Sequence, residues 1–242
     1  EVAEAELSLG RAELVQDVKS FLSYAVGCIL GRYRPDADGL AYAGGAWEEL
    51  QDKAFRPVAD NVLTITEGGD AEHDLVERFV QFVSFVFGDE QLEANLRFIA
   101  NALGSREALE ARRVIRSYFL REFYKDHLRM YRKRPIYWLL DSGKEQGFKA
   151  LMYMHRYDEH TLSRVRERHL RGRIQQALKE GDAQVKQLEE LRAYDEALKI
   201  AAAQRISIDL DDGVRTNYAK LQGIEVNEGG GSVRKVDLLS RL

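Results

Sequence analysis

Hydrophobic residues along most of the chain recur every three to four positions, the spacing of amphipathic helices. Three segments with this pattern, the last two of which end in glycine, occupy residues 12–33, 69–88 and 89–104. Residues 105–134 continue the pattern up to Pro135, and we expect a break near Ser117. The chain up to residue 134 is therefore predicted to be mostly helical.

Two stretches show a different spacing. In "IYWLLDSGKEQGFKALMYM", residues 136–154, two aromatic and β-branched runs flank "DSGKEQG", which predicts a β-hairpin with a longer loop. Because side chains alternate along a strand, Tyr137 and Trp138 should point to opposite faces. The sequence "NVLTITE", residues 61–67, predicts a further short strand.

Residues 163–205 return to the helical spacing and are divided at Gly181 and Asp182. Their Leu- and Ala-rich stripe predicts an antiparallel helical hairpin, and "NEGGGSV" near the end of the chain predicts a flexible turn or loop. The predicted fold is mainly α: a helical bundle with a small β-hairpin or sheet and a protruding helical hairpin. We expect two units, residues 1–160 and 161–242.

Charge is distributed unevenly along the chain. Residues 1–100 carry 8 Lys and Arg against 19 Asp and Glu, a net of −11, whereas residues 101–242 carry 28 against 21, a net of +7. The total of −4 therefore conceals a basic half that could face an anionic partner. A solvated helical surface carrying many charges is the alternative interpretation.

The composition argues against a disulfide-rich protein and against a membrane-spanning one. A single cysteine, Cys28, excludes an internal disulfide framework and favours a reducing, cytoplasmic location. The longest apolar run, residues 21–30, is well short of the roughly 20 residues that span a bilayer, so no membrane partner is expected. The opening residues "EVAEAELSLG" read like the interior of a protein, and we expect the chain to be a region of a larger one.

No catalytic or metal-binding motif stands out in the sequence. "HRYDEH", residues 155–160, places two histidines beside carboxylates, but the inverted zinc motif H-x-x-E-H would need His155 one residue closer. A polar loop that caps the next helix is the favoured interpretation. Phosphate-binding glycine loops and the G-x-S-x-G motif are absent from the sequence.

The remaining candidate is the basic, aromatic centre of the chain. Arg and Lys on a helix edge and a hairpin could follow a phosphate backbone. The candidate DNA contacts form a first row, Arg132, Lys133, Arg134 and Lys144, and a second row, Arg164, Arg168 and Arg171. For each residue the alternative is a solvated charge or a surface ion pair. Tyr137 and Trp138 could stack on bases, although core positions are favoured for both.

Three blocks of the sequence carry a family resemblance. They are "FLSYAVGCILGRYRPDADGLAYAGG", "FYKDHLRMYRKRPIYWLLDSGKEQGFKALMYMHRYDEHTLSRVRERHL" and "DLDDGVRTNYAKLQ". In this order they resemble the C-terminal part of the large adenine-specific DNA methyltransferases of BREX phage-defence systems. Related fused restriction–modification enzymes share similar segments. The block around "KRPIYWLLDSGK" is the most specific.

The resemblance implies a parent enzyme that transfers a methyl group from S-adenosylmethionine to an adenine amino group. The catalytic Asn-Pro-Pro-Tyr motif of such parents has no match here, since the chain has 3 prolines and none are adjacent. The resemblance therefore implies a non-catalytic region that binds no cofactor itself and that contacts double-stranded DNA or acts as a spacer.

Two other functions stay open at this point. The basic face could dock onto an acidic protein partner: the methyltransferase or target-recognition domain of the parent, another phage-defence protein, or the chain's own acidic first hundred residues. Alternatively, the region could be a structural helical spacer between domains of the parent. Salt-sensitive binding to duplex DNA would separate the first function from both of these.

Overall fold

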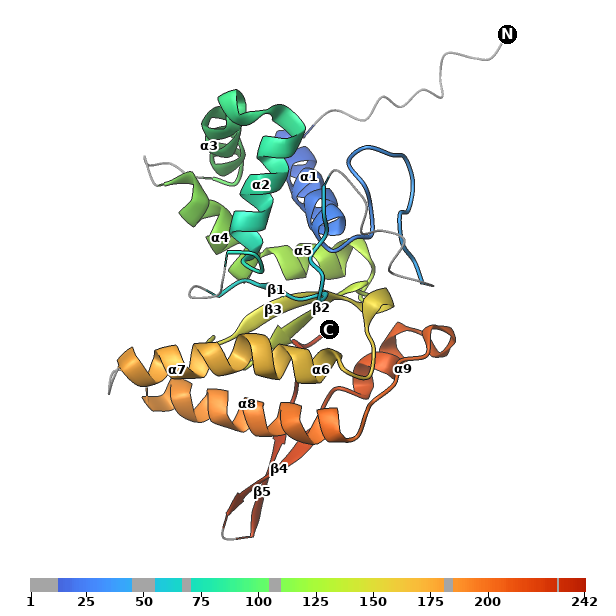
Figure 1. Cartoon of the computed structure of the whole chain (residues 1–242), viewed down its shortest axis with the longest axis vertical. Coiled ribbons are helices and arrows are strands. Elements are labelled where there is room, and N and C mark those ends of the chain that lie inside the picture. Colours follow the sequence, from blue (N-terminus) through green and yellow to red (C-terminus); the bar gives the residue numbers. More distant parts are fainter. Residues whose placement is uncertain (1–12, 45–54, 67–70, 105–109, 181–184, 230) are drawn as a thin grey trace.

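A small antiparallel sheet lies across the middle of the molecule, with a group of helices on each of its faces (Figure 1). The computed structural model describes residues 13–44, 55–66, 71–104, 110–180, 185–229 and 231–242. Helices predominate in this part of the chain, and the prediction of a mainly α fold with a small sheet is confirmed.

The sheet is built on the predicted hairpin. Strands β2 (Tyr137–Asp141) and β3 (Lys149–Tyr153) pair antiparallel, and the two-residue β1 (Leu63–Thr64) adds to β3, giving the order β1-β3-β2. The end of the chain closes the other edge: Asp141 N donates to Leu238 O at 3.2 Å, and Ser240 N donates to Leu139 O at 2.8 Å. Both predicted strand regions are thus confirmed.

Five helices cover one face of the sheet. They are α1 (Leu14–Ile29), α2 (Leu75–Phe87), α3 (Leu92–Ala102), α4 (Ala111–Arg121) and α5 (Phe123–Met130), with the 3₁₀ turn η3 (Asp89–Gln91) before α3. Asp74 caps α2, because its carboxylate accepts from Val76 N at 2.9 Å and Glu77 N at 3.0 Å.

The predicted long helix 105–134 is interrupted, but not at the expected residue. The break lies at Glu122, between α4 and α5, and Ser117 is inside α4. Phe119 and Phe123 pack together across this break with ring centroids 5.3 Å apart. Residues 105–109, where this helix was predicted to begin, lie outside the described part of the chain.

The second group of helices covers the opposite face. It comprises α6 (Thr161–Arg164), the π-helical segment η5 (Val165–Leu170), α7 (Arg171–Glu180), α8 (Val185–Ala203) and α9 (Val214–Ala219), with 3₁₀ turns η4 (Met154–Arg156) and η7 (Leu210–Asp212). Figure 1 shows that α7 and α8 run antiparallel, as predicted.

The helical pair projects only in part. Leu191, Tyr194 and Leu198 of α8 are fully buried beneath the sheet, whereas Leu178 and Val185 at the far ends of the pair are 44% and 51% exposed. The far ends extend past the sheet in Figure 1. Gly181 and Asp182, where the division was predicted, lie outside the described residues.

The sheet separates two hydrophobic clusters. Tyr137, Leu139 and Tyr153 pack into the cluster of α1–α5, whereas Trp138 and Met152 pack into the cluster of α6–α9. Tyr137 and Trp138 are 1% and 0% exposed, so both are core residues and neither can stack on a base in this conformation. The predicted alternation is confirmed, and the division at residue 160 stays a prediction.

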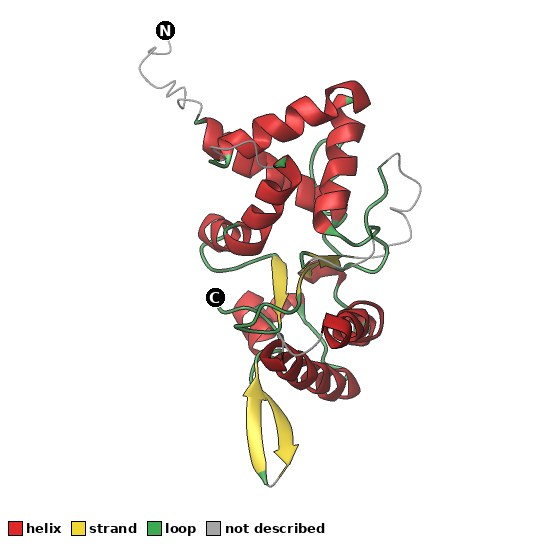
Figure 2. Ribbon diagram, turned by 90° about the vertical axis from the view of Figure 1, so that its left-hand side faces the viewer, coloured by secondary structure: helices red, strands yellow, loops and turns green. Residues whose placement is uncertain are grey.

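The element that projects furthest was not predicted. Strands β4 (Ile224–Gly229) and β5 (Ser232–Val236) form a two-stranded antiparallel ribbon that extends away from the helices (Figures 1 and 2). Residues 227–229 and 231–233 of "NEGGGSV" thus lie at the end of a hairpin, which agrees with the turn predicted there. The base of the ribbon is anchored by Ile224 and Val236, which pack into the second cluster.

Candidate nucleic-acid interface

Three consecutive cations occupy a tight turn at the end of α5. Arg132 and Lys133 both have left-handed backbone conformations, with φ of +50° and +59°, and Lys133 N donates to Leu128 O at 2.7 Å. Residues in this left-handed conformation commonly end a helix, and Pro135 prevents the helix from continuing. The side chains of Arg132, Lys133 and Arg134 are exposed, and among the described residues none of them has an ion-pair partner.

A buried histidine holds this turn against the sheet. Nε2 of His127 on α5 accepts the backbone N–H groups of Ile136 and Tyr137, both at 3.2 Å. Burial, assisted by the nearby charge of Arg32, lowers the pKa of His127 to about 3. The imidazole is therefore neutral at physiological pH and serves as a hydrogen-bond acceptor.

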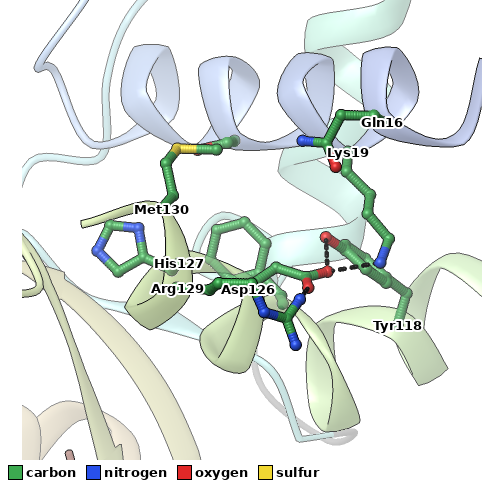
Figure 3. Close-up of a pocket in the computed structure, with 9 residues that line it drawn as sticks. Gln16, Lys19, Tyr118, Asp126, His127, Arg129 and Met130 are labelled. Carbon is green, nitrogen blue, oxygen red and sulfur yellow. Dashed lines mark hydrogen bonds and ion pairs between the residues drawn. The ribbon is translucent and has the colours of Figure 1, made fainter. Parts of the chain in front are cut away.

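A cavity of about 180 Å³ beside His127 is lined by residues that form ion pairs with one another (Figure 3). Asp126 on α5 meets Lys19 of α1 at 2.8 Å, the hydroxyl of Tyr118 of α4 at 3.1 Å and Arg129 at 2.8 Å. Asp126 thus joins side chains of α1, α4 and α5, and the cations Lys19 and Arg129 already have this carboxylate as a partner.

The second predicted row is largely neutralised. Arg164 donates to both carboxylate oxygens of Asp158 at 2.9 Å, and Arg171 pairs with Glu167. Arg168 is 61% exposed, and its nearest acid, Asp60, lies 3.9 Å away. Only Arg168 of this row is thus available for a phosphate without breaking a close ion pair.

The other arginines of this arm also have partners. Besides the pairs of Arg164 and Arg171, Arg166 binds Asp195 of α8 at 2.8 Å, and Arg173 donates to Gln187 of α8 at 2.7 Å. Asp195 and Gln187 lie in a different helix, so residues 163–173 present less unpaired positive charge than their sequence indicates.

The structure divides the first row as well. Lys144 lies in the β2–β3 loop, whereas Arg132–Arg134 precede β2 at the other end of the hairpin. Strands of five residues separate the two ends by roughly 15 Å. Lys144 instead lines an open hollow of about 690 Å³ with Arg234, Lys235 and Arg241, three C-terminal cations that sequence reasoning did not select.

The Arg132–Arg134 turn adjoins part of the second row. Met154 N donates to Ile136 O at 3.0 Å, which places η4 beside the turn. The η4 residue Arg156 lines a pocket of about 400 Å³ together with Arg164 and Arg168. These contacts bring the Arg132–Arg134 turn and Arg168 to the same end of the sheet.

Arg156 itself supports this end of the sheet from within. Its guanidinium donates to the carbonyl oxygens of Leu30, Val58 and Ala59 at 3.0, 2.9 and 2.8 Å. Burial lowers its pKa to about 9, so it remains a cation at neutral pH. Its donors already have acceptors, so Arg156 joins α1 to the loop before β1. Sequence reasoning did not identify this role.

Potential metal ligands converge elsewhere than in the "HRYDEH" segment. His160 is largely exposed, and its Nε2 lies 3.5 Å from Oε1 of the neighbouring Glu159. Among the described residues, these two do not group with a third potential metal ligand. In the part of the chain that the structure describes, ligand-type atoms of Asp60, His73 and His169 lie within 4.8 Å of one another. No sequence motif marks this group, because its members are far apart in the chain.

Two adenine-specific methyltransferases are similar to most of this chain. PglX of Lacticaseibacillus casei (strain Zhang) is 41% identical over 250 residues, covering 92% of the chain, and BrxX of Escherichia coli O9:H4 (strain HS) is 38% identical over 237 residues, covering 84%. The chain is therefore similar to one region of each of these methyltransferases. No protein-family model matches it. The expected resemblance to the BREX methyltransferases is thus confirmed.

The chain spans only 20% of the length of either PglX/BrxX relative. It therefore corresponds to one region of proteins about five times longer. The name methyltransferase describes those whole proteins. Within the described residues, no helix is both long enough and apolar enough to cross a bilayer.

Proposed function

We propose that this chain is a non-catalytic DNA-binding region of an adenine-specific methyltransferase that acts in phage defence, in a BREX-like or restriction–modification context. The parent enzyme would use S-adenosylmethionine, and this region would bind none. Its partners would be double-stranded DNA and the methyltransferase and target-recognition domains of the parent, in the cytoplasm. Other phage-defence proteins are further candidate partners.

The exposed turn Arg132–Arg134 is the observation that carries this proposal. Three adjacent cations without ion-pair partners among the described residues keep their charge available for an anion. The turn is attached to the sheet through His127 and Pro135, so it presents these charges on a rigid edge. Arg168, at the same end of the sheet, would extend the contact to a further phosphate.

Such a surface would position DNA without reading its sequence. Cations that meet phosphates fix the register of a duplex, whereas hydrogen bonds to base edges specify its sequence. Tyr137 and Trp138, the two aromatic residues considered for stacking on bases, are buried and cannot supply base contacts. Sequence recognition would therefore belong to another part of the parent.

Salt-dependent binding of the chain to two duplexes of unrelated sequence tests this proposal. We expect similar affinities for both, with log affinity falling linearly with log salt at a slope of roughly 0.9 for each phosphate contacted. Absence of binding at about 50 mM salt, or a preference of more than tenfold for one duplex, would contradict the proposed role.

Docking onto another domain of the parent is a second candidate function, and exposed aromatic residues on α2 and α3 favour it. Phe85 and Phe87 at the end of α2 are 43% and 49% exposed, and Phe98 on α3 is 55% exposed. Exposed apolar surface of this kind is typical of protein contacts rather than DNA contacts. Serine at Phe85 and Phe98 should weaken binding to the purified methyltransferase domain but leave the DNA affinity of the chain unchanged.

A further inference from the structure

Two histidines from distant segments converge on one buried carboxylate. Asp60 lies in the loop before β1, His73 lies directly before α2, and His169 lies in the π-helical segment η5. Nε2 of His169 is 2.9 Å from Oδ2 of Asp60, and Nε2 of His73 is 3.3 Å from Oδ1. The two imidazole rings meet edge to face with centroids 4.7 Å apart.

The cluster is almost shielded from water. The side chains of Asp60, His169 and His73 are 2%, 3% and 12% exposed. Within this shielded cluster, the two oxygens of the Asp60 carboxylate face the Nε2 atoms of the two imidazoles.

The surroundings orient these side chains as metal ligands are commonly oriented. Val62 N donates to Oδ1 of Asp60 at 3.1 Å, and the carbonyl of His73 accepts from Thr64 N at 2.8 Å. The first bond fixes the Asp60 carboxylate, as hydrogen bonds to ligating carboxylates do at metal sites, and the second ties the backbone of His73 to β1. His169 lies in a π-helical stretch, a geometry that occurs frequently at functional sites because it redirects side chains.

We propose that Asp60, His73 and His169 supply three of the four ligands of a zinc site. Zn²⁺ bound at about 2.0 to 2.1 Å by nitrogen and oxygen in a tetrahedron places its ligand atoms roughly 3.3 Å apart. The separations of 2.9 and 3.3 Å are already close to that value. Two imidazoles and a carboxylate suit zinc better than Mg²⁺ or Ca²⁺, which prefer oxygen ligands.

One nearby cation must be accommodated. The guanidinium of Arg168 lies 3.9 Å from Oδ2 of Asp60, but its side chain is 61% exposed and can turn toward solvent. The metal would then join three segments: the loop before β1, the start of α2 and η5. It would fix the end of the sheet where Arg168 lies. The zinc site does not depend on the proposed DNA contact, and its test involves no DNA.

The first test measures zinc uptake by the chain after removal of metals with a chelator and of any affinity tag. We expect about one equivalent of Zn²⁺ by equilibrium dialysis with elemental analysis, and a higher thermal unfolding midpoint in its presence, because a ligand that binds only the folded state stabilises it. If the folded chain takes up no Zn²⁺ at a tenfold molar excess, the proposal is overturned.

Variants then locate the ion. The variants His73→Ala and His169→Ala should each lose the bound equivalent of Zn²⁺. Of the two histidines, His73 is the more exposed and has the longer contact with Asp60. The matched control His160→Ala changes a histidine that is 64% exposed and remote from Asp60 in sequence, and it should keep that equivalent. Retention of one equivalent by His73→Ala and His169→Ala would overturn the assignment.

Co²⁺ provides a readout that does not depend on a variant folding correctly. In the unaltered chain, Co²⁺ should give the intense visible absorption of a four-coordinate nitrogen and oxygen site, and Zn²⁺ should abolish it by displacement. A weak spectrum like that of Co²⁺ in water would contradict a protein site with this geometry.

Discussion

His127 and Tyr137 are joined in two ways. The backbone N–H of Tyr137 donates to Nε2 of His127 at 3.2 Å, and the two rings stack with centroids 4.8 Å apart. The contact connects α5 to the first residue of β2, across the turn that contains Arg132–Arg134. The geometry of the exposed cations is therefore set by a buried neutral side chain rather than by the cations themselves.

Replacing His127 with leucine should destabilise the chain. The change leaves the buried N–H groups of Ile136 and Tyr137 without an acceptor, and we expect a loss of about 2 to 4 kcal/mol in the free energy of unfolding. Urea denaturation measures it. His160→Leu, at an exposed histidine, should change that free energy by no more than about 0.5 kcal/mol. Equal stability of the two variants would show that His127 does not hold the turn.

The lowered pKa of His127 predicts a loss of stability in acid. Its folded-state pKa of about 3 is below the unfolded value near 6.5, so the unfolded chain binds a proton that the folded chain does not. The contribution is complete above pH 6.5 and is lost as the pH falls toward 3. Between pH 7.5 and 5.5 it should amount to about 1.4 kcal/mol.

Urea denaturation of the unaltered chain and of His127→Leu, each at pH 7.5 and 5.5, measures that contribution. His155 also has a pKa lowered by burial and by Arg32, so acid will destabilise the unaltered chain through more than one group. The part due to His127 is the pH dependence that disappears in His127→Leu. An unchanged pH dependence in this variant would contradict the assignment.

The chain should neither bind S-adenosylmethionine nor methylate DNA. Its sequence contains no adjacent prolines and therefore lacks the Asn-Pro-Pro-Tyr motif. Calorimetric titration with the cofactor should give no binding heat, and the chain should transfer no labelled methyl group to duplex DNA above a buffer control. Methyl transfer above that control would refute a non-catalytic role.

Local patterns predicted the elements of the fold well because those patterns reflect burial. The alternation in β2 placed Tyr137 and Trp138 on opposite faces, and each is now found in a different hydrophobic cluster. The ribbon β4–β5 was missed although "IEVNEGGGSVRKV" contains the relevant signal: Ile224 and Val226 alternate with polar residues before a glycine-rich turn.

The features of the candidate site that depend on distant residues could not be predicted. Arg166 and Asp195 are 29 residues apart and pair only because α8 folds back beside η5. Asp60 and His169, separated by 109 residues, meet because the loop before β1 lies beside η5. Charge counts along the sequence cannot anticipate such pairs, so residues 163–173 looked more basic than their surface is.

The central claim is that the Arg132–Arg134 turn contacts phosphates, and a comparison of salt slopes tests it most directly. The test variant changes Arg132, Lys133 and Arg134 to alanine. The control removes the same charge at three lysines, Lys125, Lys199 and Lys235, that are each paired with a glutamate. Thermal melts must first show that both variants fold.

The slope of log affinity against log salt should flatten by about 2 to 3 for the test variant, since each lost phosphate contact removes roughly 0.9. It should change little for the control, and the preference among DNA sequences should stay the same in both. If the folded test variant keeps the slope of the unaltered chain, the turn faces solvent or another domain, and the DNA-binding account is wrong.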